Sequence, residues 1–326
     1  MRAQCRRERK TVAHERHRQQ PRGMSDGGAS SATATMRTQN RWIAGARPRT
    51  LPAALVPVAI GASVGFGQQG ARWWTVAPAL IVSLALQVGV NYANDYSDGV
   101  RGTDDVRVGP VRLVASGLAP AAQVKHAAFA AFGVAAAAGL VLAAATSWWL
   151  LVVGVASVLA GWFYTGGAHP YGYLGLGEVF VFVFFGLVAT LGTTYVVVER
   201  IPGFAWWLGS GAGSLACSLL VVNNLRDIPT DRAAGKRTLA VRLGDRRTRW
   251  LFVMLVSAAL LVLIPVAIDG HGPVLIGLAA AVAAAQPIRR VRQGAGGSEL
   301  IAVLGATGKM QLAYGVLVTA GMALAA

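Results

Sequence analysis

Residues 127–163 read AAFAAFGVAAAAGLVLAAATSWWLLVVGVASVLAGWF, and the stretch from residue 127 to residue 177 contains no Asp, Glu, Lys or Arg. A helix that crosses a bilayer needs roughly 17–25 predominantly apolar residues, so this stretch is long enough for two such helices. The whole chain has the same character: its 326 residues are 54% hydrophobic and only 13% charged, with a mean hydropathy of +0.50. Soluble domains carry about 25% charged residues. We therefore expect an all-α, polytopic integral membrane protein.

Further apolar runs predict about nine transmembrane helices in total. The candidate spans are Leu51–Phe66, Trp73–Val90 (with its helix continuing towards Tyr96), Ala121–Ala145, Trp148–Tyr164, Leu176–Val198, Phe204–Leu225, Trp250–Ile268, Pro273–Pro287 and Leu300–Ala325. No soluble linker separates them, so we expect one membrane domain over residues 41–326. Residues 1–40 are basic and then rich in Gly, Ser, Ala and Thr, which is typical of disorder. This tail contains two alternative start positions, Met24 and Met36.

The distribution of basic residues predicts the orientation in the membrane. The connections that follow the second, sixth and eighth spans carry fourteen Lys and Arg residues, whereas those on the opposite side carry only Arg72 and Arg200. Basic residues concentrate in cytoplasmic connections. We therefore expect the amino terminus and the basic connections to lie on the cytoplasmic side of the cell inner membrane.

The net charge of +16 has a second reading that we set aside. A strongly basic chain often binds nucleic acid, but here the charges fall in short blocks between apolar runs. Membrane orientation and contact with anionic lipid explain that pattern, and we expect no nucleic-acid partner.

Acidic residues are scarce, and six of the fourteen lie in two clusters on the predicted cytoplasmic side. The first cluster follows the second span in the sequence NYANDYSDGVRGTDD, where Asn91, Asp95 and Asp98 are spaced by four and three residues. Such spacing places side chains on one face of a helix. We expect this cluster to act as a single polar face at the end of the span.

The second cluster follows the sixth span in the sequence NNLRDIPTDRAAGKRT. Asp227 and Asp231 are four residues apart and share a face if the helix continues past Pro229. Clustered carboxylates need cations, and Mg2+ prefers oxygen ligands that it shares with a substrate phosphate. The nearby Arg101, Lys236 and Arg237 suit an anionic oxygen ligand. The two clusters together predict a Mg2+–diphosphate site.

These motifs resemble those of the UbiA superfamily of intramembrane prenyltransferases, whose helical bundles hold Mg2+ and an isoprenoid diphosphate between two aspartate-rich motifs. The resemblance covers about residues 41–326. Four strings resemble the branch that prenylates 1,4-dihydroxy-2-naphthoate in menaquinone synthesis. They are WIAGARPRTLPAA at 42–54, NDYSDGVRGTD at 94–104, YTGG…PYGYLGLGE at 164–178 and NNLRDIPTDRAAGKRTLAVRLG at 223–244.

The resemblance implies a role for each candidate residue. Mg2+ ligands are expected at Asp95, Asp98, Asp227 and Asp231. Substrate contacts are expected at Asn91, Asp104, Arg237 and Arg47, and catalytic roles at Lys236, Arg101 and Tyr164. Lys236 and Arg101 would stabilise charge on the leaving diphosphate, and the Tyr164 ring would stabilise an allylic cation. Many relatives carry an acidic residue where Gly102 stands, which leaves the role of Asp104 open.

The implied substrates are a polyprenyl diphosphate and an aromatic acceptor, which is prenylated with loss of CO2. A hydroxybenzoate, homogentisate or a sugar phosphate is an alternative acceptor within the superfamily. A secondary transporter is the alternative from another class, but its ionisable residues should lie near the middle of the spans. Here the aspartates collect at one end of the spans, which favours the enzyme.

Overall fold

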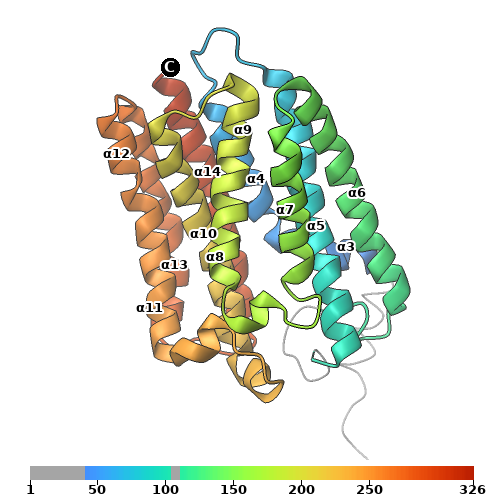
Figure 1. The fold of residues 1–326 in the computed structure, drawn as a ribbon. Coiled ribbons are helices and arrows are strands. Elements are labelled where there is room, and N and C mark those ends of the chain that lie inside the picture. The colour runs from blue at the N-terminus through green and yellow to red at the C-terminus, as the bar shows by residue number, and fades with distance from the viewer. Residues whose placement is uncertain (1–40, 104–110) are drawn as a thin grey trace, which may run out of the picture. The chain divides into compact units, whose positions relative to one another are not determined.

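The computed structural model describes residues 41–103 and 111–326 (Figure 1). The unit Trp42–Ala326 carries the fold and the site reported below. The predicted tail at residues 1–40 and the candidate Asp104 lie outside the described residues. All regular structure within the described ranges is helical, as predicted.

The elements follow one another in an up-and-down order (Figure 1). Their bounds are α3 Arg41–Ala46, η1 Pro48–Thr50, α4 Pro52–Ser63, η2 Trp73–Thr75, α5 Val76–Arg101, α6 Ala121–Ala145, α7 Trp149–Phe163, η3 Tyr171–Leu174, α8 Gly177–Val181, η4 Phe182–Val188, α9 Ala189–Val198, α10 Gly203–Ala233, α11 Leu239–Leu261, α12 Leu263–Ile268, η5 Gly272–Ala279, α13 Ala280–Arg292 and α14 Glu299–Leu324.

Within the described residues, seven helical segments are long and apolar enough to cross a membrane, and α4 and α7 are shorter apolar helices. These nine segments coincide in order with the nine predicted spans. The polytopic helical prediction is therefore confirmed, with two of the spans shorter than a full bilayer crossing.

The helices α5 and α10 extend beyond the predicted apolar spans. Helix α5 continues to Arg101 and α10 continues through Pro229 to Ala233, so Asp95, Asp98, Asp227 and Asp231 all lie on helices. Proline removes one backbone N–H and usually kinks or ends a helix. Helix α10 ends at Ala233, about one turn after Pro229.

Helix α10 is the most deeply buried of the long helices and packs against α11, η4 and α14. Small residues allow this close packing. A Cβ atom added to Gly186 of η4 would lie 2.3 Å from the Cα of Gly213 on α10, so the two backbones touch at this point. The segment η4 is a π-helical turn within the α8–α9 helix, and such turns occur frequently at functional sites.

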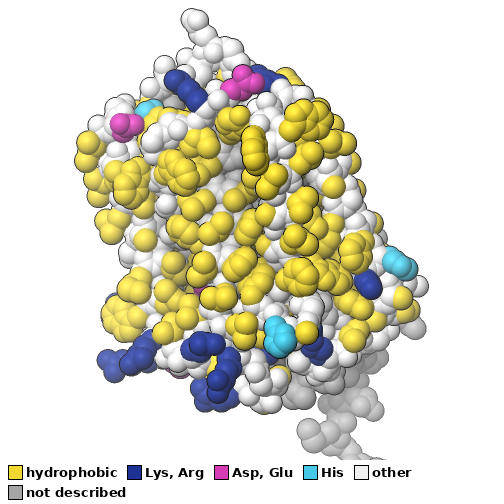
Figure 2. All heavy atoms as spheres, in the orientation of Figure 1, with side chains coloured by type: hydrophobic (Ala, Val, Ile, Leu, Met, Phe, Trp, Pro, Cys, Tyr) yellow, Lys and Arg dark blue, Asp and Glu magenta, His cyan; other side chains and the backbone are white. Residues whose placement is uncertain are grey.

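The surface has the character of a membrane protein. Figure 2 shows hydrophobic side chains over most of the displayed face, with the largest visible group of Lys and Arg at the end near the start of α11. Paired exposed tryptophans mark the opposite end, as an interfacial aromatic belt does. They are Trp73, Trp74, Trp148, Trp149, Trp206 and Trp207.

Candidate active site

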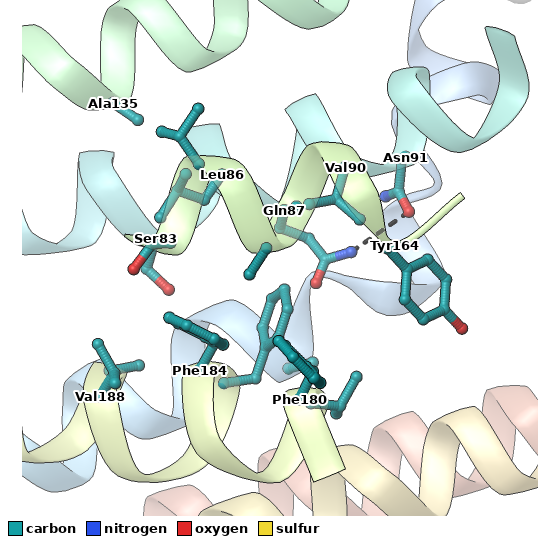
Figure 3. Close-up of a pocket in the computed structure, with 18 of the residues that line it drawn as sticks. Ser83, Leu86, Gln87, Val90, Asn91, Ala135, Tyr164, Phe180, Phe184 and Val188 are labelled. Carbon is teal, nitrogen blue, oxygen red and sulfur yellow. Dashed lines mark hydrogen bonds between the residues drawn. The ribbon is translucent and has the colours of Figure 1, made fainter. Parts of the chain in front are cut away.

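A cavity of about 750 Å³ lies between α4, α5, α6, α7, η4, α9 and α10. Its long part is apolar: α5 lies opposite Phe180, Phe184 and Val188, as Figure 3 shows. Polar side chains gather at one end, where Tyr164 lies near Asn91. The cavity therefore joins an apolar chamber to a polar end.

Asp98 is the centre of the polar end. Its Oδ1 accepts a hydrogen bond from the Tyr173 hydroxyl at 2.5 Å and lies 3.2 Å from the Lys236 Nζ. The Arg112 Nη2 lies 3.8 Å from Asp98 Oδ2. The Lys236 Nζ also lies 4.7 Å from the centre of the Tyr173 ring, within reach of a cation–π interaction. One buried carboxylate thus organises two cations and a phenol that all line the cavity.

Burial raises the pKa of Tyr173, and the Asp98 carboxylate raises it further. A raised phenol pKa favours the protonated form, so Tyr173 keeps the proton that it donates to Asp98.

Helix α10 contributes the second pair of carboxylates. Asp227 and Asp231 both line the cavity, one turn apart. The Arg226 guanidinium donates to the two oxygens of Asp227 at 2.7 and 2.8 Å, which is the bidentate arrangement that fixes a carboxylate firmly. Asn223 and Asn224 line the cavity beside them.

The oxygen donors at the polar end have the chemistry that Mg2+ requires, since carboxylate and amide oxygens are hard ligands. They come from Asp98, Asp227 and Asp231 and from the neighbouring Asn223. Among the described residues, no three acidic, His or Cys side chains converge on a single point. The residues therefore fit Mg2+ as a shared site, in which phosphate oxygens complete the ligands, rather than as a protein-only cage.

Asp95 has a different position from the one predicted for a metal ligand. It is fully buried, does not line the cavity, and accepts hydrogen bonds from the backbone N–H groups of Leu113 at 2.8 Å and Val114 at 3.0 Å. With 3.6 residues per helical turn, Asp95 lies at the flank of the cavity-facing stripe of α5. Its carboxylate instead holds the backbone segment that carries Arg112.

The cavity-facing stripe of α5 consists of Gln87, Asn91, Asn94 and Asp98. Asn91 accepts from Gln87 at 3.3 Å and donates to the Ala46 carbonyl at 2.8 Å. It therefore supports the backbone next to Arg47, which also lines the cavity. Asn94 accepts from the Thr165 hydroxyl at 2.7 Å.

Four of the predicted substrate and catalytic residues meet at the cavity: Asn91, Arg47, Lys236 and Tyr164. Arg101 and Arg237 do not line it. The Arg101 guanidinium donates to the backbone carbonyls of Thr165 and Gly167, so it supports a loop. The exposed Arg237 donates its backbone N–H to the Tyr173 carbonyl at 2.9 Å. Their roles as diphosphate contacts therefore stay predictions, since neither arginine lines the cavity in this structure.

Sequence reasoning did not select Asn94 or Arg112, although both line the cavity. A signal existed for Asn94: it precedes Asp98 by four residues, as Asn223 precedes Asp227 and Asp227 precedes Asp231. No comparable local signal identifies Arg112, because its position depends on the pairing of Asp95 with the segment that follows Arg112.

The Tyr164 ring lies against two glycines. A Cβ atom added to Gly177 would lie 3.1 Å from Tyr164 Cε2, and one added to Gly172 would lie 3.0 Å from the same atom. Burial raises the pKa of Tyr164, and the Glu178, Asp98 and Asp231 carboxylates raise it further. Tyr164 is thus a neutral ring held at the junction of the polar end and the apolar chamber.

Comparison with known proteins identifies the family. Residues 54–313 match the model of the UbiA prenyltransferase family. The chain belongs to this family. Among relatives of the UbiA family, the 1,4-dihydroxy-2-naphthoate octaprenyltransferase of Mycobacterium tuberculosis H37Rv is 50% identical over 283 residues, covering 87% of this chain and 97% of the relative. The enzyme of the same name from Escherichia coli K12 is 36% identical, covering 70% of this chain and 76% of the relative.

Solved UbiA structures have the same fold. A UbiA homologue from Archaeoglobus fulgidus, bound to GPP and Mg2+, aligns with a TM-score of 0.63 at 16% identity, covering 86% of this chain and all of the other. A second structure of that homologue, bound to DMAPP and Mg2+, aligns with a TM-score of 0.62 at 16% identity, covering 86% of this chain and 99% of the other. The predicted family, helical membrane fold and prenyltransferase class are therefore confirmed.

Proposed function

We propose that this enzyme transfers a polyprenyl group from a polyprenyl diphosphate to 1,4-dihydroxy-2-naphthoate with loss of CO2, giving demethylmenaquinol. The observation that carries the proposal is a single cavity that joins a carboxylate- and cation-lined end to an apolar chamber. The choice of acceptor is supported by the naphthoate prenyltransferases at 50% and 36% identity.

The diphosphate binds at the polar end in this proposal. Asp98, Asp227 and Asp231 would hold Mg2+, which when bound neutralises the diphosphate charge and makes it a better leaving group. Lys236 and Arg112 lie beside Asp98 and provide fixed positive charge for the oxygens of the departing pyrophosphate. Preorganised charge of this kind stabilises the transition state more than the ground state.

The isoprenoid chain lies in the apolar chamber, and its reactive carbon lies near Tyr164. The bond between that carbon and the diphosphate oxygen breaks, and pyrophosphate leaves with the electron pair. Tyr164 and Phe180 line this part of the cavity, and their rings stabilise the allylic cation. The ring carbon that bears the carboxylate then attacks the cation. Its carboxylate leaves as CO2, and the electrons of the broken bond restore the aromatic ring. Arg47 binds that carboxylate before it leaves.

We further propose that the polar end of the cavity opens on the cytoplasmic side of the cell inner membrane. Support comes from the basic residues at this end of the helices, the pattern of the positive-inside rule, and from the tryptophans at the other end.

A transfer assay with purified protein in detergent tests the function. The enzyme receives the naphthoate, a labelled polyprenyl diphosphate and Mg2+, and we expect a lipid-soluble prenylated product. EDTA and Asp227→Asn should abolish the product, whereas Glu199→Gln, on the opposite end of the molecule, should not. Turnover only with hydroxybenzoate or homogentisate would refute the acceptor, and no turnover with any aromatic would refute the reaction.

A further inference from the structure

One buried acidic side chain has no part in the reaction proposed above. Glu178 is the second residue of α8 and is 8% exposed. Its Oε1 accepts a hydrogen bond from Asn224 Nδ2 at 2.9 Å, whereas no side chain among the described residues donates to the buried Oε2. Acidic residues within membrane segments are costly and usually serve a function. The carboxylate therefore calls for an explanation beyond packing.

The hydrogen bond to Glu178 fixes the orientation of the Asn224 amide. The Glu178 Oε1 atom accepts this hydrogen bond, so it faces the NH2 group of the amide and not its oxygen. Asn224 lines the cavity, whereas Glu178 does not. With Nδ2 committed to Glu178, Asn224 presents Oδ1 as the atom for a ligand, and among the described residues the side chain of Asn224 makes the Glu178 hydrogen bond alone.

Asn224 lies at the junction of the two parts of the cavity. It precedes Asp227 by three residues on α10, so it lies about one turn closer to the apolar chamber than that carboxylate. The Tyr164 ring packs on Gly177, the residue before Glu178, and the Glu178 carboxylate contributes to the raised pKa of Tyr164. The oxygen of Asn224 is thus close to the place where an acceptor ring must meet the reactive end of the prenyl chain.

We propose that Asn224 Oδ1 is a subsite for a hydroxyl group of the aromatic acceptor, and that Glu178 is the positioning residue that keeps this oxygen facing the cavity. The proposal rests on the function proposed above. A hydroxyl that donates to Asn224 holds the acceptor ring so that its attacking carbon faces the reactive carbon of the prenyl chain. Because the donated hydrogen bond leaves more electron density on the hydroxyl oxygen, it also makes the ring a better nucleophile. A site built to pair with a hydroxyl selects against aromatics that lack one.

The experiment measures steady-state kinetics for both substrates in Glu178→Gln, Asn224→Ala and the double variant. A glutamine can face Asn224 with either its oxygen or its nitrogen, so the orientation of Asn224 is no longer fixed. We expect the KM for the acceptor to rise about tenfold, as for one lost hydrogen bond. The KM for the prenyl diphosphate should stay within about twofold. Because Glu178 acts through Asn224, the double variant should match Asn224→Ala alone.

Cys217→Ala is the matched control. The Cys217 thiol donates to the backbone carbonyl of Glu178 at 3.0 Å, so this variant disturbs the same residue without removing the bond to Asn224. It should leave the acceptor KM unchanged.

Three results would overturn the proposal: equal effects on both substrates, additive effects in the double variant, or an acceptor KM in Cys217→Ala that matches Glu178→Gln. The wild-type arm separates this test from the proposed function. If the wild type prenylates another hydroxylated aromatic instead of the naphthoate, the assignment of the acceptor fails. The ratio of the acceptor KM in each variant to that in the wild type then still tests whether Asn224 binds the acceptor hydroxyl. If it prenylates no aromatic, both proposals fail.

Discussion

Replacement of Asp95 by Asn distinguishes a carboxylate that binds Mg2+ from one that accepts hydrogen bonds from the backbone. The two oxygens of Asp95 accept from the N–H groups of Leu113 and Val114 at 2.8 and 3.0 Å. An Asn keeps one of these bonds and turns its own NH2 group toward the other N–H. The loss of one hydrogen bond to a charged group costs about 1.5–3 kcal/mol, and the N–H left unpaired adds about 1–3 kcal/mol.

We therefore expect Asp95→Asn to weaken the anchoring of the segment that carries Arg112 by about 3 kcal/mol. This corresponds to a decrease of roughly 100-fold in the ratio of docked to released segment. Because Arg112 reaches Asp98 from this segment, the affinity for prenyl diphosphate should fall. The Mg2+ concentration for half-maximal binding should not change, since Asp95 does not line the cavity.

The assay is the binding of a labelled prenyl diphosphate at a series of Mg2+ concentrations. Asp227→Asn makes the same chemical change at a carboxylate that does line the cavity, and it should raise the Mg2+ requirement. Arg112→Met should reproduce the lower affinity of Asp95→Asn with an unchanged Mg2+ requirement. An Mg2+ requirement that rises as much in Asp95→Asn as in Asp227→Asn would show that Asp95 is a metal ligand, and the reasoning from its backbone contacts would be refuted.

Three further predictions concern the other groups of the site and the orientation of the chain. Lys236→Met should lower kcat by about 10²–10³-fold, as loss of a preorganised charge at a leaving group does; a change in KM alone would contradict this role. Gly177→Ala places a methyl group 3.1 Å from Tyr164 Cε2, so kcat should fall several-fold in transfer assays while the melting temperature changes little, and unchanged kcat would exclude a precise position for the ring. A cysteine at Arg246 should react with impermeant thiol reagents only from the cytoplasmic side and one at Gln69 only from outside, and the reverse pattern would invert the proposed orientation.

The helices were the most predictable part of this protein. The predicted span Ala121–Ala145 matches α6 at both ends, because its apolar run and its helix stop together. The acidic helices are different: beyond their apolar runs, α5 continues for about three turns and α10 for about two. Hydropathy marks where the apolar environment ends, and a helix need not end there.

The side-chain partners at the site were less predictable, because they depend on segments distant in sequence. Periodicity placed Asp95 and Asp98 on neighbouring positions of one face. Only the docking of the segment around Leu113 decides that the first holds backbone while the second meets Lys236. Arg101 likewise has the charge for a diphosphate, but two loop carbonyls occupy its guanidinium. Such pairings follow from tertiary structure and leave no local pattern.

The apolar chamber has a kinetic consequence. Several residues that line it have exposed side chains, among them Phe129, Val155 and Leu159. We therefore expect the chamber to open to the lipid around α6 and α7, so that a prenyl chain reaches it by lateral diffusion within the bilayer. The concentration that the enzyme senses is then the mole fraction of prenyl diphosphate among the lipids, not its amount per volume of buffer. Addition of inert phospholipid at constant total substrate should slow the reaction, as in other surface-dilution systems, and a cell that expands its membrane lowers the rate of prenyl transfer unless it makes more substrate.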